Sequence, residues 1–277
     1  MSVIDFRLRA PYKSGKTLFN PEGLWSEKLG FKTPESIKEA SLELLLKEMD
    51  EAGVDIGVFH GRIGGILPEI KNEDVAELVE KYPDRFVGLA IVDPIHPETI
   101  VPTVEKYVVN GKLKGITLEP ALSTQPEGRY ELDSEEAYIA YKQAEKYQFP
   151  VLINYGGGGI PRNGTLSLNQ LRKVIEDFSD VNFILGHGGW PYTKEVIHLA
   201  FFHQNLYISP DVYATKFPGA EDYITAAKGI LKDQIIYGSA YPFVPVKDLI
   251  DWYRRELPDK EVQQKVTYEN AAKVLGL

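Results

Sequence analysis

The chain has 277 residues, of which 43% are hydrophobic, and a formal net charge of −9 at pH 7. These values predict one large domain with a full core, and the acidity argues against nucleic-acid binding, because backbone phosphates are recognised mainly by clustered Lys and Arg. The chain contains no cysteine, which excludes disulfides, thiolate metal sites and a cysteine nucleophile.

No targeting or membrane segment is recognisable in the sequence. Residues 1–20 lack a basic stretch followed by an apolar run, and no segment reaches about 18 uninterrupted apolar residues. We therefore expect a cytoplasmic protein with no membrane partner. The oligomeric state stays open, homo-oligomers included.

Eight short apolar runs recur along the chain, each followed by a segment of helical pattern. Strands that are buried on both faces are continuous apolar segments rather than alternating ones. The expected strands are residues 3–8, 54–59, 86–92, 115–118, 151–153, 181–185, 206–208 and 235–237. This order predicts a single-domain α/β fold over residues 1–277, a (β/α)8 TIM barrel.

Several of the expected helices have recognisable ends. Thr33 precedes a proline and an acid, so we expect it to cap a helix, and this helix is expected to stop at Gly53. Asn72 and Ser134 each precede acidic residues, which the helix dipole stabilises in a first turn. We expect helices to begin at these two positions as well.

The longest irregular segment, residues 10–32, follows the first expected strand and is rich in Gly, Pro and aromatic residues. In a barrel such a segment lies over the C-terminal mouth, where the βα loops build active sites. A surface loop packed on its own aromatic side chains is the alternative.

Polar residues stand at the carboxyl ends of the expected strands, and these ends converge on one mouth in a parallel barrel. The set combines arginines that hold an anion, histidines and carboxylates that transfer protons, and hydroxyl groups that orient a ligand, as a small-molecule site does. Its members are Arg7, Arg9, His60, Arg62, Asp93, Glu119, Asn154, Tyr155, His187, Ser209, Asp211, Ser239 and Tyr241.

Arg7 and Arg9 are separated by one residue, so both side chains should face the barrel interior. Two guanidinium groups at one place repel each other unless an anion lies between them, and a carboxylate pairs with such groups bidentately. We therefore expect both arginines to bind a small anionic substrate. A barrel-closing ion pair of one of them with Glu119 or Asp93 is the alternative.

His187 ends an apolar strand and is flanked by glycines, which let a ligand approach the backbone closely. Imidazole exchanges protons near neutral pH, so His187 is the expected acid or base, although a lone histidine is more often structural. His60 leaves its strand in the same way. The residues expected to assist catalysis are Glu119, Tyr155 and Tyr241, and those expected to bind substrate with the arginines are His60, Arg62, Asn154 and Ser239.

Four stretches in fixed order carry a resemblance that covers nearly the whole chain. They are Pro83-Asp84-Arg85-Phe86, Gly186-His187-Gly188-Gly189, Gly238-Ser239-Ala240-Tyr241-Pro242 and the terminal residues 270–276. Together they resemble the amidohydrolase superfamily. The most similar branch contains decarboxylases related to aminocarboxymuconate-semialdehyde decarboxylase and lactonases related to pyrone-dicarboxylate lactonase.

The resemblance implies a metal site whose ligands are mostly replaced in this chain. The family's ligand positions fall on Arg7, Arg9, Asn154, His187 and Ala240. Arginine donates no electron pair at neutral pH and a methyl group cannot coordinate a cation, so only His187 keeps the ligand chemistry. We therefore expect no catalytic metal and no other cofactor. The general-base role of the eighth-strand Asp in relatives does not carry over to Ala240.

The residues and the resemblance together predict a metal-independent enzyme, a hydrolase of a lactone or C–C bond that acts on a small carboxylated substrate. Guanidinium groups would supply the positive charge that a metal supplies elsewhere. A decarboxylase (carboxy-lyase) of a small aromatic or unsaturated acid is one alternative, and a non-catalytic protein that binds small anions is another. Unpaired buried charge is costly, which favours a rebuilt site over a degenerate one.

Overall fold

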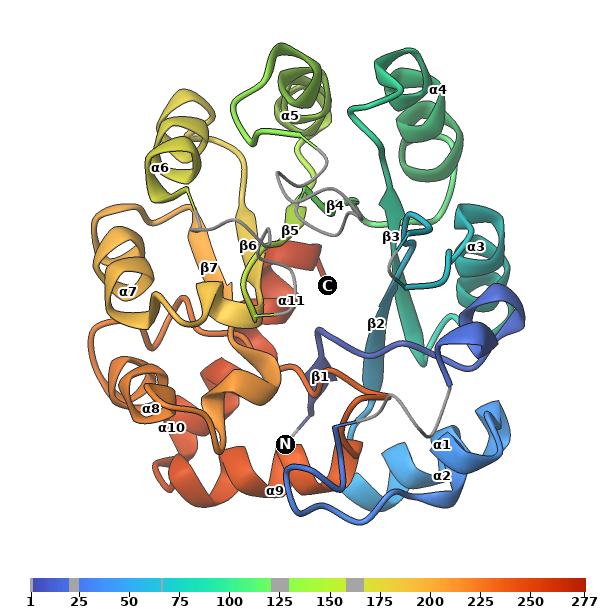
Figure 1. The fold of residues 1–277 in the computed structure, drawn as a ribbon, viewed down its shortest axis with the longest axis vertical. Helices are drawn as coiled ribbons and strands as arrows, with labels where there is room; N and C mark the ends of the chain where they lie inside the picture. Colours follow the sequence, from blue (N-terminus) through green and yellow to red (C-terminus); the bar gives the residue numbers. More distant parts are fainter. Residues whose placement is uncertain (1, 20–24, 66, 121–129, 158–166) are drawn as a thin grey trace.

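The structure is a computed structural model that describes residues 2–19, 25–65, 67–120, 130–157 and 167–277. Parallel strands form one curled sheet in the sequential order β1 to β7 (Figure 1). They are β1 (Ile4–Asp5), β2 (Ile56–His60), β3 (Phe86–Ile91), β4 (Ile116–Leu118), β5 (Val151–Asn154), β6 (Phe183–Gly186) and β7 (Leu206–Ser209). Seven of the predicted apolar runs therefore contain a strand, as expected.

The eighth predicted run, residues 235–237, closes the barrel between β7 and β1. Ile208 of β7 accepts a hydrogen bond from Ile236 N at 2.9 Å and donates one to Gln234 O at the same distance. On the other side, Phe6 N donates to Tyr237 O at 3.1 Å. The eight segments thus form the predicted α/β TIM barrel.

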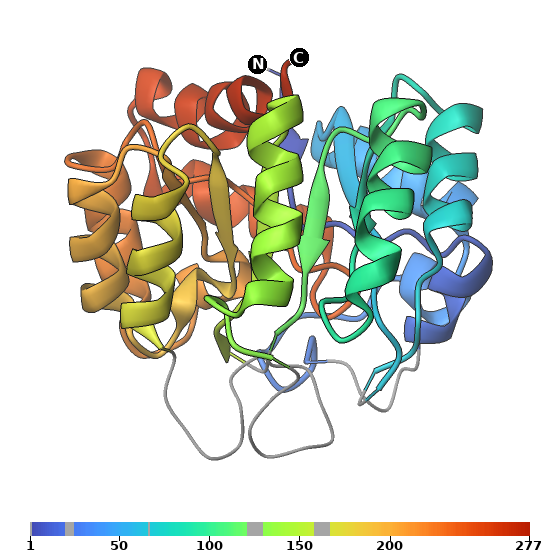
Figure 2. The ribbon, with the colours of Figure 1, turned by 90° about the horizontal axis from the view of Figure 1, so that it is seen from above.

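Helices surround the sheet on the outside, as Figures 1 and 2 show. They are α1 (Glu35–Lys38), α2 (Leu42–Ala52), α3 (Asn72–Lys81), α4 (Ile100–Val104), α5 (Glu135–Tyr147), α6 (Leu168–Asp177), α7 (Thr193–Phe202), α8 (Ala220–Lys228), α9 (Val246–Glu256), α10 (Lys260–Gln264) and α11 (Asn270–Leu275). In the described ranges, no helix is both long and apolar enough to cross a bilayer.

The helix predicted between Thr33 and Gly53 is broken in two. Its first piece, α1, starts after Pro34 without a side-chain cap, so the predicted capping role of Thr33 is wrong. The chain leaves the helical region at Ala40, whose φ is +46°, and restarts at α2, where Ser41 caps the helix by accepting a hydrogen bond from Leu44 N. Gly53 ends α2 in the left-handed conformation, as predicted.

The other two predicted helix starts have different outcomes. Ser134 caps α5, since its side chain accepts a hydrogen bond from Ala137 N at 3.2 Å. Asn72 begins α3 but does not cap it. Its amide pairs instead with the backbone of Ile91, through bonds of 2.9 and 2.7 Å, and thereby joins α3 to β3.

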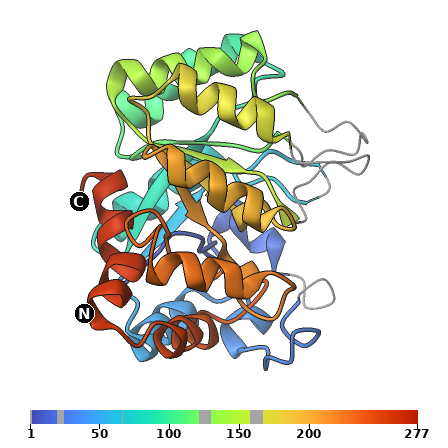
Figure 3. The same ribbon diagram turned by 90° about the vertical axis from the view of Figure 1, so that its left-hand side faces the viewer.

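Two apolar layers lie beneath the mouth of the barrel. The outer layer packs strands against helices, and the inner layer fills the barrel with alternate strand residues such as Ile4, Val58, Ile184 and Ile236. Side chains of α11 join the inner layer and cover the amino-terminal end of the barrel, the end at which Figure 3 places this helix. The alternation of strand residues places the next inward positions at the carboxyl ends of the strands, where polar side chains gather.

Candidate active site

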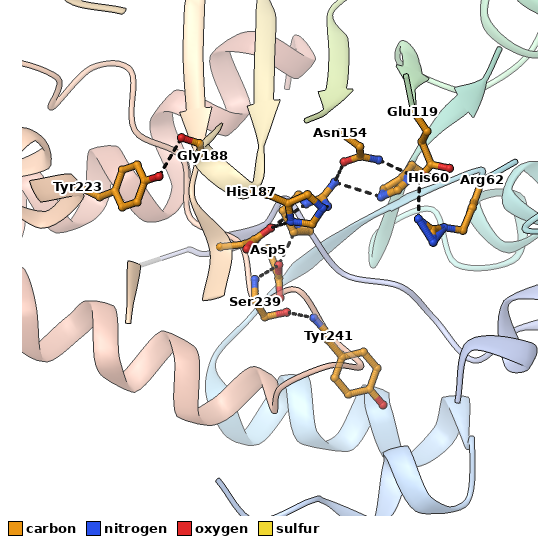
Figure 4. Close-up of polar contacts among 12 residues, drawn as sticks. Asp5, His60, Arg62, Glu119, Asn154, His187, Gly188, Tyr223, Ser239 and Tyr241 are labelled. Carbon is orange, nitrogen blue, oxygen red and sulfur yellow. Dashed lines mark hydrogen bonds and ion pairs between the residues drawn. The ribbon is translucent and has the colours of Figure 1, made fainter. Parts of the chain in front are cut away.

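Arg7 is fully buried at the barrel mouth, and every nitrogen of its guanidinium group faces a partner. Its Nη1 donates to Asn154 Oδ1 and lies 3.3 Å from His60 Nε2. Its Nη2 lies 3.2 Å from His187 Nε2, and its Nε lies 3.3 Å from Asp211 Oδ2. Figure 4 shows how the labelled members of this group, His60, Asn154 and His187, converge from the ends of β2, β5 and β6. We call Arg7, His60, Asn154, His187 and Asp211 the Arg7 cluster.

The strand that precedes Arg7 is shorter than predicted. Residues 3–8 were expected to form one strand, but β1 ends at Asp5, whose Oδ1 accepts hydrogen bonds from Arg7 N at 3.1 Å and from Ser239 N at 2.8 Å. These two bonds hold a turn that directs the following residues into the mouth. Burial raises the pKa of Asp5 to about 6, although its hydrogen bonds with Ser239 and Arg7 oppose that rise.

Two glycines, one at the end of β6 and one after the eighth segment, leave the space that Arg7 fills. A Cβ on Gly186 would lie 2.7 Å from Asn154 Oδ1 and 3.1 Å from Arg7 Nη1, and a Cβ on Gly238 would lie 2.5 Å from Arg7 Cγ. Real Cβ atoms essentially never approach another atom to 2.5 or 2.7 Å. These glycines thus create the seat for the guanidinium group, in addition to any freedom that they give the backbone.

Both histidines of the Arg7 cluster present the same ring nitrogen to the guanidinium group. Nδ1 of His60 lies 2.9 Å from Gly61 O, which only accepts hydrogen bonds, and Nδ1 of His187 lies 2.9 Å from Asp211 Oδ2. Each Nδ1 therefore carries the proton, and each Nε2 directs its lone pair at Arg7. Burial lowers the pKa of His187 to about 4 and that of His60 well below its usual value.

The residues at the mouth do not fit a metal ion while Arg7 is in place. The two Nε2 atoms, Asn154 Oδ1 and Asp211 Oδ2 are all acceptors, and all four are directed at one guanidinium group. Within the described part of the chain, no group of three or more His, Cys, Asp or Glu side chains could hold a metal ion. At the eighth-strand position the buried residue is Ala240, which offers no donor atom.

A second buried ion pair lies beside the Arg7 cluster. Arg62 Nη2 lies 3.0 Å from Glu119 Oε1, which also accepts a hydrogen bond from Asn154 Nδ2 at 3.2 Å. Glu119 therefore pairs with Arg62, whereas Arg7 pairs with Asp211. Of the predicted barrel-closing ion pairs with Glu119 or Asp93, the one through Glu119 is therefore formed by Arg62 and not by Arg7 or Arg9.

Arg9 differs from Arg7 in having free hydrogen-bonding capacity. It is 1% exposed, and its Nε and Nη1 have no hydrogen-bond partner among the described residues; the same holds for Nε and Nη1 of Arg62. Arg9 Cζ lies 5.8 Å from the centroid of the Phe243 ring. Burial lowers the pKa of Arg9 well below its usual value, and the charges of Arg7 and Arg62 lower it further.

Asp211 is the member of the cluster to which the sequence interpretation gave no role. It stood among the polar residues at strand ends, two residues after β7, but nothing in its local sequence distinguishes it. Burial alone would raise the pKa of Asp211, yet the neighbouring His187 and Arg7 hold it below its usual value. Its φ of +46° is unusual for a residue other than glycine and, with its two partners, marks a position held by its surroundings.

Three of the predicted site residues make their contacts outside the Arg7 cluster. Ser239 holds Asp5 through its backbone and accepts a hydrogen bond from Tyr241 N at 2.9 Å. The hydroxyl of Tyr241 donates to Ser36 Oγ at 2.9 Å, and Figure 4 shows its ring directed away from His187. Tyr155 packs in the layer between strands and helices. The structure thus brings together Arg7, His60, Arg62, Glu119, Asn154 and His187 of the predicted set.

Comparisons with known proteins show what this chain is similar to. The family model described as Amidohydrolase matches residues 38–277. An uncharacterised TIM-barrel protein from Bordetella bronchiseptica is 30% identical, with a TM-score of 0.90 over 100% of this chain and 99% of the other.

Two further solved structures share the fold at lower identity. A probable 2-pyrone-4,6-dicarboxylic acid hydrolase from Acinetobacter baumannii, with citric acid bound, is 15% identical, with a TM-score of 0.66 over all of both chains. A dihydroxybenzoic acid decarboxylase from a Polaromonas species, with bound manganese, is 16% identical, with a TM-score of 0.65 over 100% of this chain and 97% of the other.

Proposed function

The chain belongs to the amidohydrolase family, and on that premise we propose that it is a hydrolase that cleaves a lactone or C–C bond in a small carboxylated substrate without a metal ion. Arg9 and Arg62 bind the carboxylate, His187 moves the proton, and Arg7 supplies a fixed positive charge. The observation that carries the proposal is that two buried arginines have nitrogens without a partner among the described residues, and that the charge of one of them, Arg9, acts on a histidine held by a carboxylate.

Nitrogens of Arg9 and Arg62 that have no hydrogen-bond partner among the described residues support carboxylate binding at these two residues. Arg62 uses Nη2 in its ion pair with Glu119, which leaves its Nε and Nη1 unpaired. Buried donors without a partner are unfavourable, so a protein keeps them where an anion completes them. Two guanidinium groups with parallel N–H donors suit a carboxylate in particular. Arg7 was expected to share this role, but its nitrogens already face four side chains, so we assign it a different one.

His187 is neutral at neutral pH and is the group that we assign as the proton acceptor. Its pKa of about 4 leaves the ring neutral, and Asp211 holds the Nδ1 proton so that Nε2 is the basic atom. With 15% of its side chain exposed, it is more accessible than Arg7 or Asp211, which are at 0%. A water molecule that attacks the substrate would give its proton to Nε2 in exchange for the contact with Arg7.

Arg7 suits the role of an electrostatic stabiliser. Its charge is held in place before the reaction by Asn154, Asp211 and the two imidazoles, and Asn154 and Asp211 keep it there while negative charge develops on the substrate oxygen. Preorganised positive charge in a site from which water is excluded is among the largest contributions to catalysis. Glu119, which joins Arg62 to Asn154, keeps the carboxylate-binding side of the site in register with the Arg7 cluster.

A substrate screen in water labelled with oxygen-18 tests the proposal. Carboxylated lactones and β-diketone acids are incubated with the wild-type protein and with His187→Gln, and the products are analysed by mass spectrometry. We expect one labelled oxygen in the product of the wild-type reaction and a turnover reduced at least a hundredfold in the variant. Release of CO2 with no oxygen-18 in the organic product would instead support a decarboxylase, and saturable binding without turnover would support an anion-binding protein.

A further inference from the structure

A cavity of about 360 Å³ lies at the barrel mouth, beyond the Arg7 cluster. Three of its lining residues follow β5, β6 and β7 by three or four positions, and the rest come from the segment after β1 and the segment before α8. Its walls are mostly aromatic. The lining residues are Trp25, Lys28, Leu29, Gly157, Trp190, Tyr213 and Phe217.

The aromatic walls of the cavity contact the proposed site at two points. The ring of Tyr213 meets the ring of His187 edge to face, with centroids 5.8 Å apart. At the other end, Phe243 lies 5.7 Å from Trp25 and 5.8 Å from the guanidinium carbon of Arg9. Neither the arginines nor His187 line the cavity, so a ligand that occupies both places needs a linker that passes these rings.

Contacts among the wall residues hold the aromatic faces in place. Trp190 stacks on Tyr213 with an interplanar angle of 17° and a centroid distance of 5.2 Å, and its Nε1 donates to Pro218 O at 2.9 Å. A Cβ on Gly157 would lie 2.0 Å from the hydroxyl oxygen of Tyr213, so this glycine leaves room for the ring. Phe217 completes the wall, 4.7 Å from Tyr213.

From this geometry we propose that the cavity is a distal substrate subsite for a planar aromatic group, joined by a linker to the carboxylate that Arg9 and Arg62 bind. Aromatic rings stack or meet edge to face at centroid distances of about 4.5–7 Å, which rigid aromatic walls offer to an incoming ring. The volume lies in the range of small-molecule sites and accepts a two-ring group. The carboxylate half of this inference rests on the proposed function, and the aromatic half stands on the cavity alone.

Calorimetric titrations with three probes separate the two halves. Indole carries only a ring system, acetate carries only a carboxylate, and indole-3-butanoate joins the two by a flexible chain. We expect saturable binding of each, with the joined probe binding at least tenfold more tightly than either part, because the second contact becomes intramolecular.

Variants of the wild-type chain assign each half to its residues. Trp190→Ala and, separately, Trp25→Ala should weaken indole at least tenfold, as expected for a buried aromatic anchor, and should leave acetate binding unchanged. Arg9→Gln should weaken acetate binding at least tenfold and leave indole binding unchanged. Trp252→Phe is the matched control, because Trp252 lies outside the cavity and donates to Ala214 O. Circular dichroism checks that each variant folds.

The aromatic subsite and the carboxylate site can fail these tests separately. Indole that does not bind the wild type, or that binds both tryptophan variants as tightly as the wild type, overturns the distal subsite even if acetate binds as expected. Acetate that fails to bind, while indole binding depends on Trp190 and Trp25, overturns the carboxylate assignment and leaves an aromatic site. If the joined probe binds no better than indole and acetate do separately, the two sites do not serve one ligand.

Discussion

The Nη2 atom of Arg7 lies 3.2 Å from Nε2 of His187, so the basic nitrogen of the site faces a permanent cation. The same guanidinium group contacts Nε2 of His60 and the side chains of Asn154 and Asp211. A protein-bound metal ion usually has similar surroundings. Acceptor atoms converge on it, and each ligating imidazole donates its other ring N–H to a second group. Here the positive centre is a residue of the chain.

Removing the charge of Arg7 should therefore destabilise the fold. Arg7→Met keeps much of the volume but leaves the buried Asp211 carboxylate without its cation, and we expect a loss of about 3–5 kcal/mol in the free energy of unfolding. Arg255→Met, at an exposed arginine, should change it by less than about 0.5 kcal/mol. Denaturant unfolding measures both.

The double variant Arg7→Met/Asp211→Asn provides the internal check on that interpretation. Because it removes both charges, it should recover part of the loss, with a coupling energy above about 1 kcal/mol. If the double variant loses as much stability as the two single variants lose together, the two side chains do not depend on each other.

We also expect a protein without stoichiometric metal. A divalent ion near Arg7 would be repelled by the guanidinium charge, and the acceptors that might bind the ion are engaged. Elemental analysis of protein purified without chelators should give far less than one zinc or manganese per chain, and a chelator should not shift the melting temperature. About one metal per chain, with a lower melting temperature after chelation, would contradict this view of Arg7.

The low pKa of His187 predicts a specific pH dependence of stability. Its folded-state pKa of about 4 lies below the usual 6.5, so the unfolded chain binds this proton more readily. The resulting stability is present above pH 6.5 and is lost as the pH falls from there through 4, by a total on the order of 3 kcal/mol. Asp5 has the opposite effect. Its pKa is raised to about 6, so the stability that it contributes at low pH is lost as the pH rises through that value.

Comparison with His187→Gln isolates the histidine from Asp5 and the other carboxyl groups. The difference in unfolding free energy between the wild type and this variant should shrink as the pH is lowered from 7 to 4. A difference that stays constant over this range would mean that His187 titrates near its usual pKa in the folded protein.

The break between α1 and α2 offers a stability test remote from the site. Ala40 has a φ of +46°, which is unfavourable for a residue with a Cβ and free of penalty for glycine. Ala40→Gly should therefore raise the free energy of unfolding by up to about 1 kcal/mol. Ala76→Gly, in the middle of α3, should lower it by about the same amount. Equal losses in both variants would rule out strain at Ala40.

Most of the fold could be predicted from the sequence because buried parallel strands are continuous apolar runs with recognisable spacing. All eight predicted runs take part in the barrel. The early end of β1 could not be predicted, because the turn depends on a bond between Asp5 and Ser239 N, which are far apart in the sequence. The break at Ala40 was equally hidden, since nothing in the local sequence signals a positive φ at an alanine.

For the candidate site, the sequence located the strand ends but not the pairing among them. Arg7, His60, Asn154 and His187 were identified because each ends a strand. The pairing of Arg7 with Asp211, and of Arg62 with Glu119, depends on which strand ends are neighbours in space. Tyr241 was assigned to the site by position alone, whereas its hydroxyl reaches Ser36 on the outer side.

Titration with a carboxylate and its neutral isostere decides whether Arg9 binds an anion. Acetate and its neutral isostere acetamide are titrated into the wild type, Arg9→Gln and Arg9→Lys, with Arg255→Gln as the control. We expect acetate to bind the wild type in preference to acetamide and to lose about 2–5 kcal/mol of binding free energy in Arg9→Gln, with only part recovered by Arg9→Lys, which lacks the planar fork. Acetate that binds Arg9→Gln as tightly as the wild type, or acetamide that binds the wild type as tightly as acetate, would show that the buried arginine is structural and that the anion-binding account is wrong.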